Sequence, residues 1–180
     1  EVQSDKARKV LAMMETSVDR MAGLIDNVMD FARGRLGGGI GLERAMTPLE
    51  PALRHVVDEL ETANPRRRIH CRLDLPSPVN VDGGRLAQLV SNLLGNALTH
   101  GDAQQPVYLH AYVGADQLTI SVSNAGAPIP EAAMERLFQP FFRGEGCGSQ
   151  QGLGLGLYIA SEIAKAHGGR RGVRPDAAET

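Results

Sequence analysis

The chain has 180 residues, which is room for one ordinary domain plus an appended element, and its 42% hydrophobic and 22% charged residues are typical of a soluble globular protein. A formal net charge of −2 argues against a general attraction to nucleic acid or to an acidic membrane surface. No apolar run approaches the roughly 20 residues that span a bilayer, the N-terminus has no secretory core, and Cys71 and Cys147 are too few for a disulfide framework. We therefore expect a cytoplasmic protein with no nucleic-acid partner and no membrane insertion of its own.

The first predicted element is a long helix from Ser4 to about Arg33, a stretch without proline and with Gly23 as its single glycine. Its apolar residues follow one another at steps of three and four, which is a heptad seam, and a second row widens the stripe. At about 1.5 Å per residue the helix reaches roughly 45 Å, so we expect a bundle helix rather than a core helix of one domain. The seam consists of Val10, Met14, Ser17, Met21, Leu24, Val28 and Phe31, and the second row of Leu11, Val18, Ile25 and Ala32.

Crowded glycines at 34–41 interrupt this helix and predict a linker that reaches residue 47 and includes a first strand over 40–46. Thr47 as the cap and Pro48 as the first helical residue then predict a helix over 48–63. The alternation of helices and strands beyond it, with an antiparallel-looking pair in the middle, predicts an α/β sandwich. Its further elements are expected as a strand over 67–75, a helix over 84–100, strands over 107–113 and 118–124, a short helix over 131–138, a loop over 143–151 and a last helix over 153–167.

Three consecutive arginines, Arg66, Arg67 and Arg68, stand before the first of these strands. A nucleic-acid contact is one interpretation. No basic or aromatic partners surround them in the sequence, so we favour a solvated strand entry.

The first segment with chemical potential is the pair Asn92 and Asn96. Residues four apart on a helix share one face, so the two amides lie one turn from each other. Amide oxygens can ligate a hard cation and amide NH2 groups can meet phosphate oxygens. Magnesium takes only one or two protein oxygens when phosphates complete its shell, which suits such a pair. Taken alone, the pair is more often an ordinary helix surface.

Three further segments follow in order. The turn at 124–130 comes directly after a strand and contains Gly126, which permits close approach of backbone to a ligand. The segment 137–143 contains three phenylalanines, expected to form a small core under a loop, and ends in Arg143, a candidate phosphate contact. The alternating glycines at 152, 154 and 156 open a helix whose backbone N–H groups and dipole would attract an anion, with the intervening leucines filling the floor beneath.

The ordered set NLLGNALTHG, NAGAPIP, LFQPFFRG and GLGLGLYIASEIAKAHGG resembles the asparagine, first-glycine, phenylalanine and second-glycine boxes of bacterial sensor histidine kinases. DGGRLAQLVSNLL and RMAGLIDNVMDFAR extend the resemblance over nearly the whole chain. It implies a two-layer α/β sandwich of the GHKL (histidine-kinase ATPase) type over 48–180, with a mixed sheet under three helices. It also implies that 37–47 is a linker and that 1–36 is the second helix of a dimerisation and histidine-phosphotransfer hairpin whose first helix is absent from this sequence.

The resemblance further implies binding of ATP and Mg²⁺. Asn96 would be the magnesium ligand, Asn92 its companion at the phosphates, and Asn124 would stand where the family has an adenine-reading Asp. Arg143 would lie at the edge of a lid over 143–152 that closes over the nucleotide. The full implied ATP-binding set is Asn92, Asn96, Thr99, His100, Asn124, Gly126, Ile129, Arg143, Gly152, Leu153, Gly154, Leu155, Gly156 and Leu157.

Departures from the family pattern are also present. Asn124 is uncharged, so we expect weaker ATP binding. Thr99 stands where a basic residue is common, so we expect that one phosphate contact has passed to His100 or been lost. The terminal RRGVRPDAAET lacks the family's closing strand pair, which leaves the far edge of the sheet undefined. Each of the five histidines is followed by Val, Cys, Gly or Ala, whereas the family's phosphoacceptor precedes an acidic residue.

The implied activity is transfer of the ATP γ-phosphate to a histidine on a helix outside this chain, for relay to a response-regulator receiver domain. The implied partners are that helix, the receiver domain, and a second copy joined through residues 4–33, with a parent protein that can be membrane-tethered. The alternative is a nucleotide-binding or inert dimerisation and regulatory module without kinase activity, which the departures at Asn124 and Thr99 favour. A gyrase-like or chaperone-like ATPase is less favoured, because such enzymes usually carry a catalytic Glu where Asn92 stands.

Overall fold

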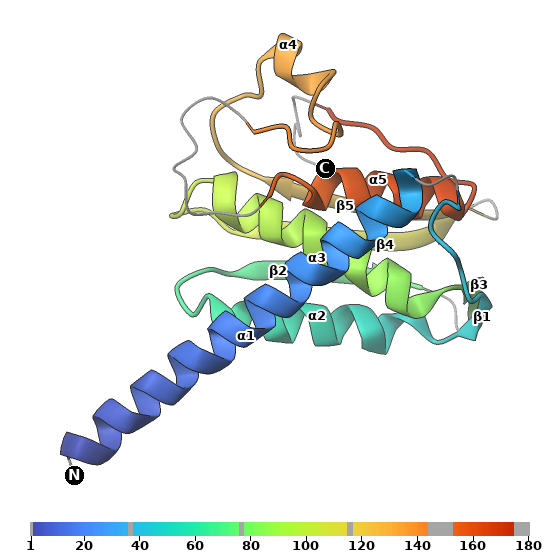
Figure 1. Cartoon of the computed structure of the whole chain (residues 1–180). Helices are drawn as coiled ribbons and strands as arrows, with labels where there is room; N and C mark the ends of the chain where they lie inside the picture. Colours follow the sequence, from blue (N-terminus) through green and yellow to red (C-terminus); the bar gives the residue numbers. More distant parts are fainter. Residues whose placement is uncertain (1, 36–37, 76–77, 115–116, 144–152, 175–180) are drawn as a thin grey trace.

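The computed structural model describes residues 2–35, 38–75, 78–114, 117–143 and 153–174 (Figure 1). Helix α1, Val2–Arg35, confirms the long first helix: its N-terminal half extends away from the rest of the molecule, and its C-terminal end crosses over α3 and α5. Within the described residues, no helix is both long enough and apolar enough to cross a membrane.

The main sheet is mixed, as expected. Within the described residues β4, Val107–Gly114, lies between β2, Ile69–Asp74, which runs parallel to it, and β5, Gln117–Asn124, which runs antiparallel. Val107, Leu109 and Ala111 alternate along β4 with the exposed Tyr108 and Tyr112. This period of two turns one face of the sheet toward the helices and leaves the other open to water.

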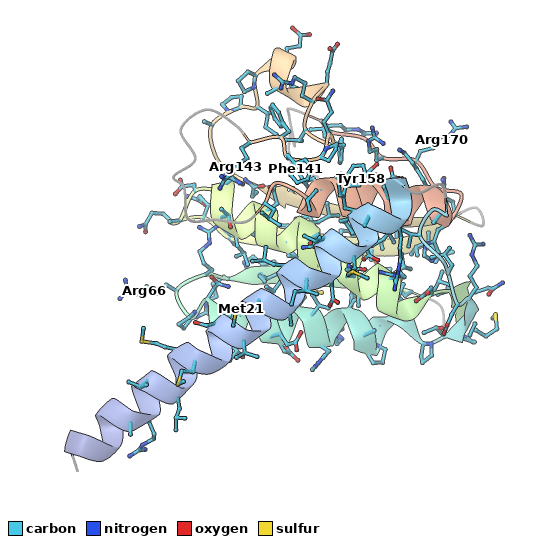
Figure 2. The ribbon with its side chains drawn as sticks, viewed as in Figure 1. Met21, Arg66, Phe141, Arg143, Tyr158 and Arg170 are labelled. Carbon is cyan, nitrogen blue, oxygen red and sulfur yellow. The ribbon has the colours of Figure 1, made fainter. Side chains whose placement is uncertain are left out.

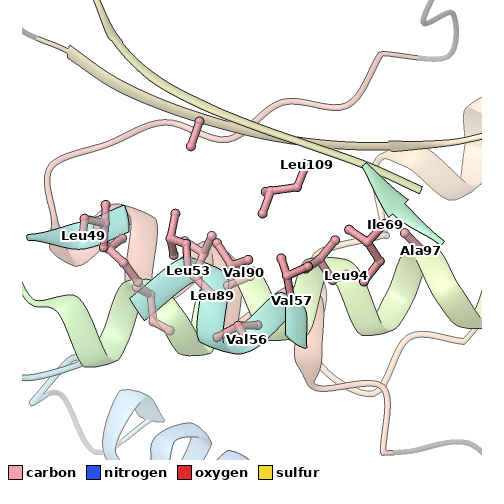
Figure 3. Close-up of a cluster of buried hydrophobic side chains, with 14 of the residues drawn as sticks. Leu49, Leu53, Val56, Val57, Ile69, Leu89, Val90, Leu94, Ala97 and Leu109 are labelled. Carbon is pink, nitrogen blue, oxygen red and sulfur yellow. The ribbon is translucent and has the colours of Figure 1, made fainter. Parts of the chain in front are cut away.

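Three helices cover the apolar face of this sheet: α2, Leu49–Ala63; α3, Gly83–His100; and α5, Gly156–Ala166. Helix α3 lies between the other two, packs on both and also contacts β4 and β5. The side chains between the layers form one core, part of which Figure 3 shows. The two-layer α/β sandwich is therefore confirmed. The most fully buried members are Leu53, Val90, Leu94, Val107, Ala111, Ile159 and Ile163.

Several expected boundaries are wrong. The strand β3, Val79–Val81, was not predicted; it pairs antiparallel with β1, Ala45–Thr47, which is shorter than the predicted first strand. Thr47 is not a helix cap, because its hydroxyl donates to the carbonyl oxygens of Ala45 and Val81 across this ribbon. The helix after Pro130, α4, covers only Glu131–Met134 and turns replace the rest of the predicted span.

Candidate functional site

Asp82 fixes the start of α3, the helix that carries both asparagines. Its carboxylate accepts hydrogen bonds from the backbone N–H of Arg85 at 3.0 Å and of Glu43 at 2.8 Å. The first bond is an N-cap, and the second ties the segment before β1 to the helix. Burial on its own would raise the pKa of Asp82, but these two bonds, with the charges of Arg85 and His167, outweigh it and lower the pKa.

Asn92 faces the beginning of α5. A Cβ atom at Gly156, the first residue of that helix, would lie only 3.3 Å from Asn92 Oδ1, so the absent side chain lets the amide approach the backbone there. Asn92 Nδ2 is buried and has no hydrogen-bond partner among the described residues. The N-cap residue of α5 is Leu155, whose side chain has no oxygen that could accept from the N–H groups at the helix start. One desolvated donor and a helix N-terminus with open N–H groups thus meet at one point, which suits an anion.

The other candidates on α3 follow Asn92 toward its C-terminus. Asn96 is half-buried one turn further on, and Thr99 and His100 are exposed at the helix end. Eight residues from Asn92 to His100 cover about 12 Å along the helix axis. The candidate site therefore runs along α3 rather than surrounding a single point.

Asn124 and Gly126 lie at the C-terminal end of α3. Asn124 ends β5, and a Cβ at Gly101 would lie 2.8 Å from its Nδ2 atom, so Gly101 lets the helix end pack directly on this side chain. The N–H of Asp102 donates to the carbonyl oxygen of Ala125 at 2.7 Å, which joins the two loops. Gly126 also lies close to the end of α3, because a Cβ atom at this glycine would be 3.6 Å from the His100 carbonyl oxygen.

Gly154 packs against the turn that contains Phe141. Its φ of +69° is a left-handed conformation that favours glycine, and a Cβ there would lie 2.8 Å from the Phe142 carbonyl oxygen. The Phe141 N–H donates to the Gly154 carbonyl oxygen at 3.0 Å, and Phe141 has itself a φ of +63°. These backbone contacts bring Arg143 toward the start of α5 (Figure 2). Arg143 is exposed and follows Phe141 by two positions.

The remaining candidates are divided. Leu155 is only 2% exposed and its side chain lies in the core, where the leucines between the glycines were expected to fill the floor of the site. Leu157 is half-buried, whereas Ile129 and Leu153 are exposed and free to contact one. Gly152 and the predicted lid beyond Arg143 lie outside the described residues.

Sequence reasoning missed Asp82, Gly101, Asp102 and Arg67. Arg67 was expected in a solvated strand entry, but it is half-buried and its Nη1 atom donates to the carbonyl oxygen of Asp102, whereas Arg66 and Arg68 are exposed. The Asp82-Gly83 dipeptide before an apolar run was a usable cap signal. The other three act through contacts distant in sequence, which no local pattern reveals.

Helix α1 docks beside this site through hydrogen bonds to Asp30 and ring contacts of Phe31. Asp30, 4% exposed, accepts hydrogen bonds from Arg85 Nη1 at 2.7 Å and from Gln88 Nε2 at 2.9 Å. The ring of Phe31 packs edge-on against Phe141 at 5.0 Å and against Tyr158 at 5.7 Å between centroids.

A cleft of about 680 Å³ lies between α1 and α3, with Asn92 on its wall. Gly23 and Asp26 on α1 and Ser91 on α3 also line it. The phosphate end of the candidate site therefore faces the long helix.

Comparisons with known proteins identify the family. Residues 81–179 match the family described as histidine kinase-, DNA gyrase B-, and HSP90-like ATPase. The bacteriophytochrome of Pseudomonas aeruginosa is 35% identical over 160 residues, which are 87% of this chain and 22% of that protein. Full-length ShkA, solved in complex with AMPPNP, has a TM-score of 0.66 and 29% identity, covering 89% of this chain and 34% of that one.

A further solved structure, ThkA in complex with the response regulator TrrA, has a TM-score of 0.63 over 89% of this chain and 45% of that one. At 22% identity it shows the fold alone. This chain spans between 16% and 45% of the length of the first curated relatives that it matches. The matched family covers more than half of the chain and includes the asparagine helix and the glycine segments. The chain therefore belongs to the family of histidine kinase-, DNA gyrase B- and HSP90-like ATPases, as the ATP-binding catalytic region of a sensor histidine kinase.

Proposed function

We propose that this region transfers the γ-phosphate of ATP to a histidine on a helix outside the 180 residues, and that a response-regulator receiver domain then takes the phosphate. The observation that carries the proposal is the buried Nδ2 of Asn92, which has no hydrogen-bond partner in the described part of the chain and lies beside the N-terminus of α5. The site faces α1, so an acceptor helix packed on α1 would reach the phosphate end from that side. The complex of ThkA with TrrA supports a receiver domain as the second partner.

The residues act by position and charge. Asn92 Nδ2 and the N–H groups at the start of α5 hold phosphate oxygens, and Arg143 neutralises charge at the mouth of the site. Asn124 accepts from the adenine amino group, with Gly126 below the base. When the bond from the γ-phosphorus to the bridging oxygen breaks and a bond to an imidazole nitrogen forms, little covalent chemistry is left to the protein. Orientation therefore supplies most of the acceleration.

Magnesium enters this site with the nucleotide. Among the described residues no group of three or more His, Cys, Asp or Glu side chains is placed to hold a metal ion. A single amide oxygen from Asn96 fits an ion that takes its other ligands from phosphates and water. Bound there, the ion would neutralise charge that develops on the phosphates.

Calorimetry with ATP in magnesium and in EDTA tests the assignment. Asn96→Ala should weaken Mg-ATP binding at least ten-fold, about 1.4 kcal/mol, because a ligand of the ion is lost. In EDTA the variant and the parent chain should bind ATP alike. Asn80→Ala, which removes an exposed asparagine on β3, is the matched control. It should change the ATP affinity neither in magnesium nor in EDTA. An unchanged Mg-ATP affinity in Asn96→Ala would refute the role of Asn96.

Phosphoryl transfer is tested separately, in a protein that also contains the residues preceding Glu1 in its parent. Incubation with γ-labelled ATP should give an acid-labile, base-stable phosphate on a histidine. Nucleotide binding without any labelling would instead favour the alternative, a regulatory module that senses nucleotide. The uncharged Asn124 is the observation that favours this alternative.

A further inference from the structure

Arg67 has a desolvated guanidinium that local sequence does not explain. Its Nη1 atom donates to the carbonyl oxygen of Asp102, and its Nε and Nη2 atoms are buried without a hydrogen-bond partner among the described residues. Burying part of a charged group is unfavourable unless the remaining contacts compensate. Arg66, beside it, is exposed and points away from the body of the molecule (Figure 2). Arg67 therefore belongs to a structural network and not to the solvated surface.

The network leads through Asp102 to the end of β5. The Asp102 carbonyl oxygen also accepts from Gln105 N–H at 3.2 Å, and Asp102 Oδ1 accepts from Gln104 N–H at 2.8 Å, so this loop is held on both sides. The Asp102 N–H then donates to the Ala125 carbonyl oxygen at 2.7 Å. Arg67 thus contacts, through one residue, the loop that follows Asn124.

The orientation of the Asn124 amide depends on that same carbonyl group. Asn124 Nδ2 donates to the Ala125 carbonyl oxygen at 3.1 Å, which leaves Oδ1 of this exposed side chain as the atom that can accept from a ligand. The Cβ position of Gly101, 2.8 Å from Nδ2 and 3.0 Å from Asn124 Cβ, shows how closely the helix end packs against one side of this exposed side chain. A carboxylate presents an acceptor in either orientation. An amide has one donor end and one acceptor end, so it needs a fixed orientation to read a base.

We propose that Arg67 is a positioning residue for base recognition, which acts through Asp102 and Ala125 to hold Asn124 with its oxygen toward the nucleotide. The inference rests on the proposed function, in which Asn124 meets the base. An outward oxygen accepts from the exocyclic amino group of adenine and repels the carbonyl oxygen that guanine carries at that place. Arg67 thereby sets the preference for ATP over GTP, although it touches neither.

The test is the ratio of ATP to GTP affinity, measured by calorimetry on the whole chain. Arg67→Met should lower the ratio at least five-fold, because the Asn124 amide is then free to turn. Arg67→Lys keeps a donor for the Asp102 carbonyl group and should retain most of the ratio. Arg66 is a neighbouring exposed arginine, so Arg66→Met is the matched control and should leave the ratio of ATP to GTP affinity unchanged. If Arg67→Met does not fold, as near-ultraviolet circular dichroism will reveal, Arg67→Gln replaces it.

A double-mutant cycle separates positioning from general damage. In an Asn124→Leu background, Arg67→Met should have no further effect on the ratio, since the residue through which it acts is gone. The side-chain amide NMR signals of Asn124, identified by their loss in Asn124→Leu, should shift in Arg67→Met without nucleotide. Equal loss of ATP and GTP affinity, or an unchanged ratio, overturns the inference. If the parent chain binds neither nucleotide, it is the proposed function that fails.

Discussion

Asp82 joins parts of the chain that are far apart in sequence. Besides the bonds that its carboxylate accepts from Arg85 and Glu43, its own N–H donates to His167 Nε2 at 3.2 Å, and His167 Nδ1 lies 2.9 Å from the Ile163 carbonyl oxygen. The start of α3, the segment before β1 and the end of α5 therefore meet at one residue. Because α3 carries both asparagines, this junction positions the phosphate end of the site.

The lowered pKa of Asp82 predicts a dependence of stability on pH. A carboxyl group whose folded pKa lies below its ordinary value of 3.8 contributes stability that is present above that value and lost as the pH falls through the folded pKa. Asp82→Asn keeps a capping oxygen and removes the charge, so it should destabilise the chain at pH 7 by roughly 1 kcal/mol. Urea unfolding at pH 7, 5, 4 and 3 should show the difference shrinking below about pH 4. A difference that stays constant to pH 3 would mean that the charge is irrelevant.

The single-residue predictions succeeded and failed for physical reasons. Gly154 was singled out from its spacing, and its left-handed φ is a local requirement. Leu155 was expected to fill the floor beneath the glycines, and the turn into α5 directs its side chain into the core. Arg67 was expected in solvent because its partner lies 35 residues away in the sequence. Sequence patterns report what a residue prefers, whereas desolvation is decided by what packs against it.

At the scale of elements, the docking of α1 depends on the pair Asp30–Arg85. The side chains are 4% and 22% exposed, so the ion pair is screened little by water. The pair Arg54–Glu50 has the same 2.7 Å separation but is exposed on α2. The two arginines therefore form a matched comparison of buried and exposed pairing.

We expect Arg85→Met to leave the Asp30 carboxylate buried and without its charged partner, at a cost of about 3 kcal/mol to the docking of α1. Amide hydrogen exchange over 22–34 should accelerate strongly in this variant. Undocking exposes this C-terminal part of α1 to water and lets it open more often. Arg54→Met should leave exchange there unchanged. Equal protection of 22–34 in Arg85→Met and in the parent chain would show that the aromatic contact of Phe31 alone holds the helix.

The element predictions depended on length. The 34 residues of α1 and the 18 of α3 gave long periodic signals, and the eight-residue strands β4 and β5 alternate along their length. The three-residue strands β1 and β3 are too short for any period to appear, and Thr47 was read as a cap because its role in a ribbon depends on a distant partner. Long local order can be predicted from sequence, and short non-local pairing cannot.

At the scale of the whole molecule, α1 presents a broad apolar stripe to solvent. Phe31, from the predicted seam, packs on the catalytic region, so the exposed stripe ends before it. A stripe of this size is uncommon on a monomer in water. Its members, each at least 44% exposed, are Val10, Leu11, Met13, Met14, Val18, Met21, Ile25, Val28 and Met29.

We expect the chain to self-associate through this stripe, as the sequence-predicted bundle helix implies. Each large apolar side chain buried there contributes roughly 1.5–3 kcal/mol before the entropy of association is subtracted. Sedimentation of the parent chain should show dimers or larger species at high concentration, and Val18→Glu with Ile25→Glu should abolish them. Met46→Glu, at an exposed methionine on β1, should not. A parent chain that sediments as a monomer throughout would contradict the bundle interpretation.

The contacts of α1 with the rest of the molecule lie near its C-terminal end, which gives the helix the mechanics of a lever. Asp30 and Phe31 form the fulcrum, and Val10 lies 20 residues away, at about 30 Å along the axis. A tilt of about 10° at the fulcrum moves that end by about 5 Å, close to one helical turn. The relation also holds in reverse, so a displacement of about one helical turn at the far end reaches the Arg85 and Phe141 contacts as a rotation of about 10°. A small rotation of α1 at its contacts beside the proposed nucleotide site would thus correspond to a large displacement of its N-terminal end.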